Sequence, residues 1–534
     1  MSFASPFPDV DIPDQTVYDY LFAAITESEL DRSALIDGTS GAVTTYRTLL
    51  DQINGVARAL VARGLDVGDV VGLHSPNNPA FASVFHGILR AGATATTINA
   101  LYTAEEIAKQ LTDSGTKFLF TVSALLPQAE DAANRAGIPV DRLIVIDEAR
   151  DHLSLPLLLA EDAPELEVSV DPATHIAVLP YSSGTTGKPK GVILTHRNLV
   201  ANIAQMESRL GITSDDAILA VLPFFHIYGL TILLNIALKL RARLVTMAKF
   251  ELNEFLGIVH EHRLTYLFVA PPVAVALAKH PAVEQYDLSS VHTVFSGAAP
   301  LDEELGKSVA KRLDVRVRQG YGMSELSPAS HAIPFDREDI PLSSVGLPVA
   351  NTVNKLVDPD TGEEIDPPAA GMSAPGELWV KGPNVMAGYL NNPDATAETV
   401  DDEGFLHTGD IATVDSRGAV YIVDRLKELI KYKGYQVPPA ELEALLLTNP
   451  KIADSAVIGV IDADSGEEIP KAFVVRQPEA DLTADEVIEF VAGQVAPHKK
   501  VRAVEFIDAI PKSASGKILR KDLRAPATAE PNRR

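Results

Sequence analysis

The sequence contains no cysteine among its 534 residues. This absence excludes a disulfide framework, a thiolate metal site and a catalytic thiol, so any thioester chemistry must use a thiol that arrives with a substrate. Positive charge is also scarce, because 46 lysines and arginines face 72 acidic residues and leave a formal net charge of −26. Such a chain repels nucleic acid wherever basic residues do not cluster, and we expect no nucleic-acid partner.

Long hydrophobic runs and targeting signals are missing as well. The longest apolar stretch, near residues 228–240, includes Asn235 and Lys239 and is shorter than the ~18 residues that a transmembrane helix needs. The first residues lack the pattern of a secretory signal, and the final PNRR carries no peroxisomal or lipidation signal. We therefore expect a cytoplasmic protein without a membrane span, acting as a monomer or weak homodimer.

The residues that are present are typical of a globular α/β protein. The composition is 46% hydrophobic and 22% charged, and a chain of this length is expected to form more than one domain. Apolar residues at helical spacing over 46–63 predict a helix. Short β-branched or aromatic runs at 70–73, 118–122 and 143–146 alternate with helical segments, which predicts mostly parallel sheets.

The pattern changes toward the C-terminus. Short strands separated by glycine and proline turns over about 340–424 predict a β-rich subdomain. After a basic stretch that begins at Arg425, a helix start at Pro438-Pro439 and a capping box at Thr483–Glu486 indicate a second, smaller domain. Its strands are expected at 455–461, 472–475 and 501–507. We predict an N-terminal domain over 1–424 and a C-terminal domain over 425–534.

The most informative segment is YSSGTTGKPKG at residues 181–191, between two apolar runs. Strand, loop and strand is the natural interpretation. The loop offers backbone N–H groups, hydroxyls and two lysines to a polyphosphate. It is not a Walker A loop, because Lys188 is followed by proline. The structural alternative is a flexible surface turn.

This loop resembles the signature of the adenylate-forming (AMP-binding) superfamily, and four later segments are similar to its other motifs, in the right order. They are QGYGMSE at 319–325, LHTGD at 406–410, VDRLKELIKYKGYQ at 423–436 and PKSASGK at 511–517. One such loop can arise by chance, but five ordered motifs rarely do. The resemblance spans nearly the whole chain and implies a large α/β N-terminal domain with a small, hinged C-terminal α/β domain that carries catalytic lysines.

The resemblance also implies a reaction and its site residues. A carboxylic acid would attack the α-phosphate of ATP, and the acyl-adenylate would then pass its acyl group to coenzyme A. For ATP or AMP it implies Ser182, Ser183, Gly184, Thr185, Thr186, Lys190, Gln319, Gly320, Tyr321, Ser324, Asp410, Arg425, Lys427 and Lys517. Glu325 would bind Mg²⁺, whose preferred ligands are hard oxygens.

Catalytic roles follow in the same way. Lys517 would stabilise charge on the α-phosphate, and Lys431 would reach the adenylate in the second step. His226, at the mouth of the acyl site, and Gln436 would also be catalytic residues. Lys249, Lys433 and Gly434 would contact coenzyme A. Taken singly, each has an ordinary alternative: a solvated lysine, a capping carboxylate, or a tyrosine packed beside a turn.

The acid is suggested by PFFHIYGL at 223–230, which looks most like the corresponding run of 4-coumarate:CoA ligases. Carried over position by position, the acyl pocket would comprise Ile227, Tyr228, Thr231, Phe268, Phe295, Gly297, Ala298, Gly322, Pro328 and Ala329. Phe295 departs from the plant enzymes, which usually carry a lysine there, and with Phe268 it makes the far end apolar. We expect Gly297 to leave room for a ring or chain.

We therefore expect an aryl propenoic acid, 4-coumarate or cinnamate, as the substrate, with a medium-chain fatty acid as the alternative. More distant alternatives are a luciferase-like monooxygenase, an adenylation enzyme that loads a carrier protein, and a nucleotide-binding protein without catalysis. Other chemistry finds no support, because the sequence holds neither a Gly-x-Ser-x-Gly elbow nor a His-Glu-x-x-His zinc helix.

Overall fold

The computed structural model describes residues 2–148, 151–182, 189–432, 435–462, 468–513 and 516–524. The chain divides into two compact units. The large unit comprises Phe3–Asn354 and Val380–His407, and the small unit comprises Met1–Ser2, Lys355–Trp379 and Thr408–Arg534. This division follows packing, and a functional boundary near Asp424 stays a prediction.

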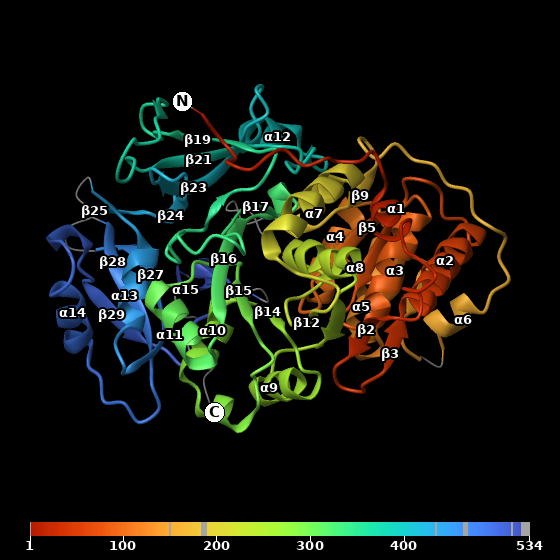
Figure 1. The fold of residues 1–534 in the computed structure, drawn as a ribbon, viewed down its shortest axis with the longest axis horizontal. Coiled ribbons are helices and arrows are strands. Elements are labelled where there is room, and N and C mark those ends of the chain that lie inside the picture. Colours follow the sequence, from red (N-terminus) through yellow and green to blue (C-terminus); the bar gives the residue numbers. More distant parts are fainter. Residues whose placement is uncertain are drawn as a thin grey trace. The chain divides into compact units, whose positions relative to one another are not determined.

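The first sheet of the large unit, which includes β5 and β9 in Figure 1, has nine strands, and β10, the strand before the predicted phosphate loop, ends its strand order. Its strands, in spatial order, are β10 (Tyr181–Ser182), β11 (Lys190–Thr195), β9 (Ile176–Val178), β5 (Thr94–Ile98), β4 (Val70–His74), β6 (Phe118–Thr121), β7 (Leu143–Val145) and β8 (Leu153–Ser154), and β22 (Gly388–Tyr389) pairs with β11. Neighbours from β9 to β8 are parallel, whereas β10, β11 and β22 are antiparallel additions. The predicted strands at 70–73, 118–122 and 143–146 are confirmed.

The second sheet of the large unit also has nine strands. In spatial order they are β18 (Leu347–Pro348), β17 (Ala329–Ala332), β16 (Arg316–Gly322), β15 (Thr293–Ser296), β14 (Tyr266–Val269), β12 (Ala217–Ala220), β13 (Arg243–Thr246), β2 (Ser33–Asp37) and β3 (Val43–Thr45). The six strands from β16 to β2 are parallel. Parallel sheets of this kind bind ligands at the carboxyl ends of their strands, which here include Gly320–Gly322 and Ser296.

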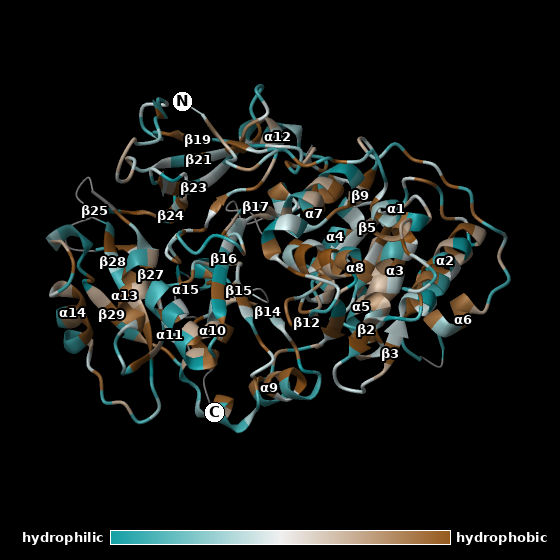
Figure 2. Cartoon of the chain, viewed as in Figure 1, coloured by the Kyte–Doolittle hydropathy of each residue, from teal (hydrophilic) through white to brown (hydrophobic). Residues whose placement is uncertain are grey.

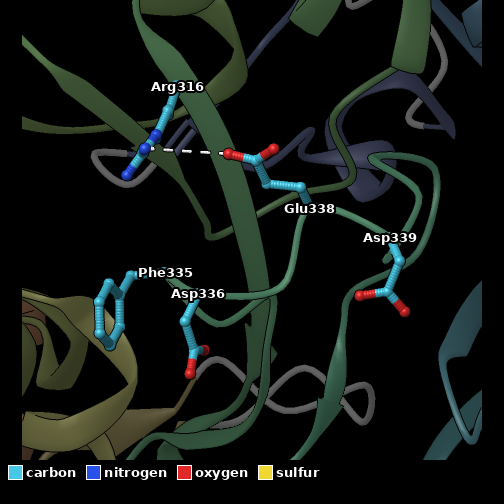
Figure 3. A pocket seen from close by; sticks show the side chains of 5 residues that line it. All are labelled: Arg316, Phe335, Asp336, Glu338 and Asp339. Atoms are coloured by element: carbon cyan, nitrogen blue, oxygen red, sulfur yellow. Dashed lines mark ion pairs between the residues drawn. The ribbon is translucent and has the colours of Figure 1, made fainter.

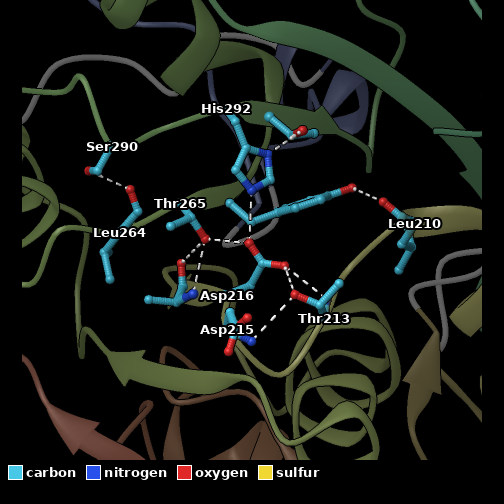
Figure 4. A network of polar contacts seen from close by, with 11 residues as sticks. Leu210, Thr213, Asp215, Asp216, Leu264, Thr265, Ser290 and His292 are labelled. Carbon is cyan, nitrogen blue, oxygen red and sulfur yellow. Dashed lines mark hydrogen bonds and ion pairs between the residues drawn. The ribbon is translucent and has the colours of Figure 1, made fainter. Parts of the chain in front are cut away.

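A polar network fixes the opposite, amino ends of three of these strands (Figure 4). Asp216, Thr265 and His292 stand immediately before β12, β14 and β15. The Asp216 carboxylate accepts from Thr265 Oγ1 at 2.7 Å and lies 2.8 Å from His292 Nε2. Burial raises the pKa of Asp216, but its hydrogen bonds from His292 and Thr265 outweigh burial and hold the pKa at about 2. The network ties the strands together at the edge away from the predicted site.

Helices alternate with these strands, as the sequence predicts. Those of the large unit are α1 (Val17–Phe22), α2 (Tyr46–Ala62), α3 (Pro79–Arg90), α4 (Ala104–Asp113), α5 (Leu126–Ala136), α6 (Leu155–Leu159), α7 (His196–Leu210), α8 (Ile236–Leu240), α9 (Leu252–Glu261), α10 (Pro271–Lys279), α11 (Glu303–Leu313) and α12 (Pro393–Thr399), with a π-helix, η3, at Tyr228–Asn235. The predicted helix over 46–63 is α2, which Thr45 caps by accepting from the Thr48 N–H. Figure 2 shows α8, a buried helix, as largely hydrophobic and α11 as largely hydrophilic.

A third sheet has six strands, and the chain passes between the two units within three of them. Its order is β1 (Phe3–Ala4), β19 (Val353–Val357), β21 (Gly376–Lys381), β23 (Leu406–Val414) and β24 (Val420–Arg425), with β20 (Glu364–Ile365) paired to β19. These strands account for most of the β-rich region predicted at 340–424.

The rest of the small unit is an α/β fold with its own core. It holds the hairpin of β25 (Ile430–Tyr432) and β26 (Tyr435–Val437), the sheet of β27 (Ile452–Ile461), β28 (Glu468–Arg476) and β29 (Ala503–Phe506), and the helices α13 (Pro439–Leu447), α14 (Ala484–Ala492) and α15 (Arg520–Arg524). The predicted capping box at Thr483 and Glu486 is present. Both units alternate helices and strands, which confirms the α/β fold class. Across the described ranges, no helix combines the length and apolar character needed to cross a membrane.

Candidate active site

The predicted phosphate loop lies between β10 and β11, which pair as a hairpin that joins Ser182 to Lys190. Ser183, Gly184, Thr185 and Thr186 lie outside the described residues. Ser182 Oγ donates to Glu325 Oε1 at 3.1 Å, and the Tyr389 hydroxyl donates to the same oxygen at 2.9 Å. Lys190 Nζ sits 4.6 Å from the centre of the Tyr389 ring. The structure thus brings three predicted residues, Ser182, Lys190 and Glu325, into one cluster.

Glu325 is 6% exposed and stands in a short turn, η5 (Ser324–Leu326), beside Ser324. Both of its described side-chain contacts use Oε1, so Oε2 remains available to a hard cation. No cluster of three or more potential metal ligands occurs in the described ranges. This chemistry fits Mg²⁺ carried by a nucleotide, because Mg²⁺ usually combines one or two carboxylates with phosphate oxygens.

The QGYG segment forms the carboxyl end of β16. A Cβ on Gly320 would lie 2.7 Å from the His331 carbonyl oxygen, and one on Gly322 would lie 2.2 Å from that of Pro328. Glycine is therefore required where β16 passes β17 and its preceding loop. The side-chain amide of Gln319 contacts backbone groups of Leu301 and Leu342, and its role as a nucleotide ligand stays a prediction.

A cavity of about 60 Å³ lies beside this segment in the large unit. Predicted acyl-site residues that line it are Tyr228, Phe295, Gly297, Ala298, Gly322, Pro328 and Ala329, joined by His226 and by Gly320 and Tyr321. Ile227, Thr231 and Phe268 are buried but do not line it. Phe268 instead backs the wall, with its ring centre 5.5 Å from that of Phe295.

The cavity is small, and the ring of Tyr228 fills the space beside Gly297 in its wall. A Cβ on Gly297 would lie 2.7 Å from ring atoms and the hydroxyl of Tyr228. The room that we expected at Gly297 is therefore filled by Tyr228. A cavity of ~150 Å³ holds benzene, so an aryl acid fits this one only if lining side chains move. Two flexible residues in the wall, Met206 and Met323, can do so.

Two further predicted site residues, His226 and Lys249, also belong to the large unit. His226 Nδ1 accepts a hydrogen bond from the Tyr228 N–H at 3.3 Å. Gly229 lies in the first turn of the π-helix, and a Cβ at this position would lie 2.1 Å from the Pro223 carbonyl oxygen, so only glycine fits there. Lys249 is exposed between β13 and α9 and does not line the cavity.

In the small unit, the residues predicted for ribose and α-phosphate form one charged cluster. Asp410 and Arg425 are paired across β23 and β24, with Arg425 Nε 3.5 Å from Asp410 Oδ1. Asp410 is 6% exposed. The amine of Lys517 responds to the charges of Arg425, Glu428 and Asp410. Lys517 lies 107 positions after Asp410 and 92 positions after Arg425 in the sequence, yet the three residues are electrostatic neighbours.

Burial lowers the pKa of Lys517 to about 8, and the nearby positive charge of Arg425 contributes to the shift. Within the described residues, Lys517 Nζ makes no hydrogen bond of its own. A partly buried ammonium that has no fixed hydrogen-bond partner among the described residues is suited to an anionic ligand such as a phosphate.

The second predicted lysine, Lys431, has different surroundings. It lies on β25 opposite Gln436 on β26, and its side chain is exposed. Lys427 is exposed in the turn between β24 and β25. Lys433 and Gly434 lie outside the described residues, as does the side chain of Gln436.

A larger cavity of about 520 Å³ lies elsewhere in the large unit (Figure 3). It is lined by Arg316, Phe335, Asp336, Glu338 and Asp339. Arg316 approaches Glu338 at 3.8 Å, so its charge is already opposed. An opening with three carboxylates repels phosphate, and it contains none of the predicted site residues.

Sequence reasoning missed several residues that the structure places at these sites. Tyr389 meets Glu325 from 64 positions away, and Met206, Ile232, Met323 and His331 complete the cavity wall. Met323 lies within the recognised segment 319–325, which was a usable signal. His331 comes beside Tyr321 through the pairing of β16 with β17. His331 is buried, its Nε2 has no hydrogen-bond partner among the described residues, and burial lowers its pKa to about 3. The wall is therefore less apolar than Phe295 and Phe268 suggested.

Comparison with known proteins places these sites in a family. The chain matches the AMP-binding enzyme family over residues 22–390 and the AMP-binding enzyme C-terminal domain over residues 441–517. It is 42% identical over 533 residues to 4-coumarate–CoA ligase 1 of Solanum tuberosum, which covers 98% of this chain and 96% of that protein.

Solved structures agree with this assignment. ATP-bound MatB from Rhodopseudomonas palustris is similar with a TM-score of 0.86 and 30% identity, covering 95% of this chain and 98% of that one. The anthranilate CoA ligase AuaEII in complex with anthranoyl-AMP has a TM-score of 0.87 and 26% identity, covering 96% and 98%. The chain therefore belongs to the AMP-binding enzyme family and, within it, to the acid–thiol ligases.

Proposed function

We propose that this ligase activates an aryl propenoic acid of the 4-coumarate or cinnamate type with ATP and transfers the acyl group to coenzyme A. The 42% identity to a 4-coumarate–CoA ligase over 98% of the chain supports this acid and this acceptor. The aromatic lining of the cavity, from Tyr228, Phe295 and Tyr321, supports a flat substrate. The observation that carries the mechanism is the cluster of Lys517 with Asp410 and Arg425.

The first step forms the acyl-adenylate. A carboxylate oxygen of the acid attacks the α-phosphorus of ATP, the bond to the β-phosphate oxygen breaks, and pyrophosphate leaves. Lys517 offsets the charge that develops on the α-phosphate oxygens. Asp410 accepts hydrogen bonds from the ribose hydroxyls, beside Arg425, and the ring of Tyr321 packs against the adenine.

Glu325 is the proposed Mg²⁺ ligand. Its buried carboxylate is held by Ser182 and Tyr389 through one oxygen only. When bound, Mg²⁺ neutralises phosphate charge and orients the pyrophosphate leaving group. Tyr389 and Ser182 keep the Glu325 carboxylate in a fixed orientation, and Lys190 adds positive charge near the same loop.

The second step transfers the acyl group. The sulfur of coenzyme A attacks the acyl carbonyl carbon, and AMP leaves with the electron pair of the broken acyl–oxygen bond. We propose that Lys431 serves this step, that His226 stands at the mouth of the acyl cavity, and that Lys249, Lys433 and Gly434 contact coenzyme A. No enzyme thiol is required, consistent with the absence of cysteine.

Acid-dependent exchange of labelled pyrophosphate into ATP tests the first step. The panel is cinnamate, 4-coumarate, benzoate and octanoate, with Lys517→Ala as the inactive variant. Lys451→Ala is the matched control, because Lys451 is a lysine of the same unit that pairs with Glu486 at the surface. Preference for the two aryl propenoates supports the proposal, whereas preference for octanoate replaces the substrate and keeps the reaction.

A further inference from the structure

Arg520 is a buried cation that stands three residues after Lys517. It is the first residue of α15, and its side chain is 10% exposed. Its guanidinium donates to Glu428 Oε2 at 2.6 Å and to both carboxylate oxygens of Glu443 at 2.7 Å. Its Nε donates to the Val457 carbonyl at 3.2 Å. One side chain thus joins three segments of the small unit: the turn after β24, helix α13 and strand β27.

The segment that carries Lys517 is attached at both ends. Lys512 and Ile518 form a β-bridge, and the Ser513 N–H donates to the Lys517 carbonyl at 2.8 Å. At the first end, Lys512 Nζ pairs with Asp454 of β27. At the second end, Arg520 makes the contacts described above. The backbone around Lys517 is therefore held between two ion pairs, of which that of Arg520 is the more buried.

Glu428 carries a negative charge that acts on the Lys517 amine, so it can compete with the α-phosphate for this amine. The charged groups that act on this amine are Arg425, Glu428, Asp410 and Arg520. Glu428 is 17% exposed and is neutralised by Arg520. If the guanidinium were removed, the Glu428 carboxylate would lose its partner in a poorly solvated position, and its charge would then act more strongly on the Lys517 ammonium, which it already influences.

We propose that Arg520 is a positioning residue for adenylation, which anchors the Lys517 segment and occupies Glu428 so that the Lys517 amine stays available to the α-phosphate. This inference rests on the role proposed above for Lys517. It assigns Arg520 no contact with the substrate. If Arg520 has this role, the harm done by removing it depends on the charge of Glu428. If Arg520 only stabilises the fold, removing the charge of Glu428 does not restore activity.

Two variants separate positioning from structure. Arg520→Met removes the charge and keeps much of the volume, and the double variant Arg520→Met with Glu428→Gln also removes the competing carboxylate. We expect Arg520→Met to lower kcat for pyrophosphate exchange by about 10- to 100-fold, with KM for the acid little changed. The double variant has a higher kcat than Arg520→Met, and the gain in log kcat is at least a third of the loss in log kcat that Arg520→Met shows. Arg520→Lys, which keeps a charge without the two-pronged geometry, gives an intermediate rate.

The ionisation of Lys517 provides a readout that does not depend on the reaction. Competitive labelling with acetic anhydride across pH, read on the Lys517 peptide by mass spectrometry, reports the pKa of this amine. The pKa rises in Arg520→Met, because a positive neighbour is lost and Glu428 is freed, and it returns toward the parent value in the double variant. Unchanged labelling in Arg520→Met, or a double variant as impaired as the single one, overturns the inference. Absence of exchange with every acid in the parent enzyme overturns the proposed function instead, and the labelling still decides the role of Arg520.

Discussion

Gly297→Ala tests the steric account of the acyl cavity. The backbone at Gly297 has no positive φ, so alanine meets no conformational penalty there. Its methyl group would, however, stand 2.7 Å from Cε1, Cζ and the hydroxyl oxygen of Tyr228. The ring is buried and contacts Phe268, with ring centres 6.4 Å apart. The ring therefore has little room to retreat and is expected to turn into the cavity of about 60 Å³.

The magnitude follows from the energetics of overpacking. One added carbon in a well-packed core costs about 1 to 3 kcal/mol. If the cost is expressed when the acid binds, it lowers kcat/KM by about 5- to 160-fold, since 1.36 kcal/mol is tenfold in rate. The loss is expected for ring-containing acids and is smaller for a short acid that does not reach Gly297.

The assay is pyrophosphate exchange with cinnamate and with propanoate, reported as the ratio of the two kcat/KM values. Gly257→Ala is the matched control, because a Cβ at Gly257 in α9 finds only the Tyr286 ring edge at 3.9 Å. The ratio falls in Gly297→Ala and is unchanged in Gly257→Ala. A fall of less than twofold in Gly297→Ala would refute the claim that Tyr228 and Gly297 set the width of the cavity.

Three further predictions concern the nucleotide side and the cavity wall. Lys517→Ala lowers the exchange rate by about 10²- to 10³-fold. In the parent enzyme the exchange rate falls as the pH rises past the Lys517 pKa of about 8, because the neutral amine no longer offsets the phosphate charge. A flat pH–rate profile up to pH 9.5 would contradict this. Glu325→Gln raises the Mg²⁺ concentration for half-maximal exchange by about tenfold, measured by Mg²⁺ titration, and an unchanged titration would remove Glu325 from the metal site. Met206→Ala enlarges the cavity, so it raises the kcat/KM for acids bulkier than cinnamate relative to that for cinnamate. It also lowers the free energy of unfolding by about 2 to 5 kcal/mol, measured by urea denaturation. Equal selectivity before and after the change would show that Met206 does not limit the size of the acid.

Local patterns predicted the elements well. The periodicity over 46–63 identified α2, and the apolar runs on either side of residues 181–191 match β9 and β11. The short strand β10 lies within the predicted loop and was not foreseen. These features depend on residues near one another in sequence, where propensity, capping and turn chemistry decide the outcome. The order of strands in the two large sheets was beyond such patterns, because β2 joins the second sheet next to β13, about 200 residues later.

Candidate site residues that belong to a sequence motif could be predicted, whereas residues that reach the site through tertiary packing could not. Asp410, Arg425 and Lys517 came from motifs, and the small unit gathers them. Tyr389 and Arg520 belong to no recognised segment, yet each is the main partner of a predicted residue or its neighbour. The filling of the space at Gly297 depends on the position of the Tyr228 ring, which no spacing rule fixes.

The central claim is best tested by measuring ATP-dependent thioester formation with coenzyme A and, separately, with a phosphopantetheinylated carrier protein as the acceptor. Cinnamate and 4-coumarate are the acids, and Lys517→Ala is run beside the parent enzyme. The account predicts rapid formation of the coenzyme A thioester from both acids, little transfer to the carrier protein, and loss of both in the variant. Release of pyrophosphate with no coenzyme A thioester would contradict it.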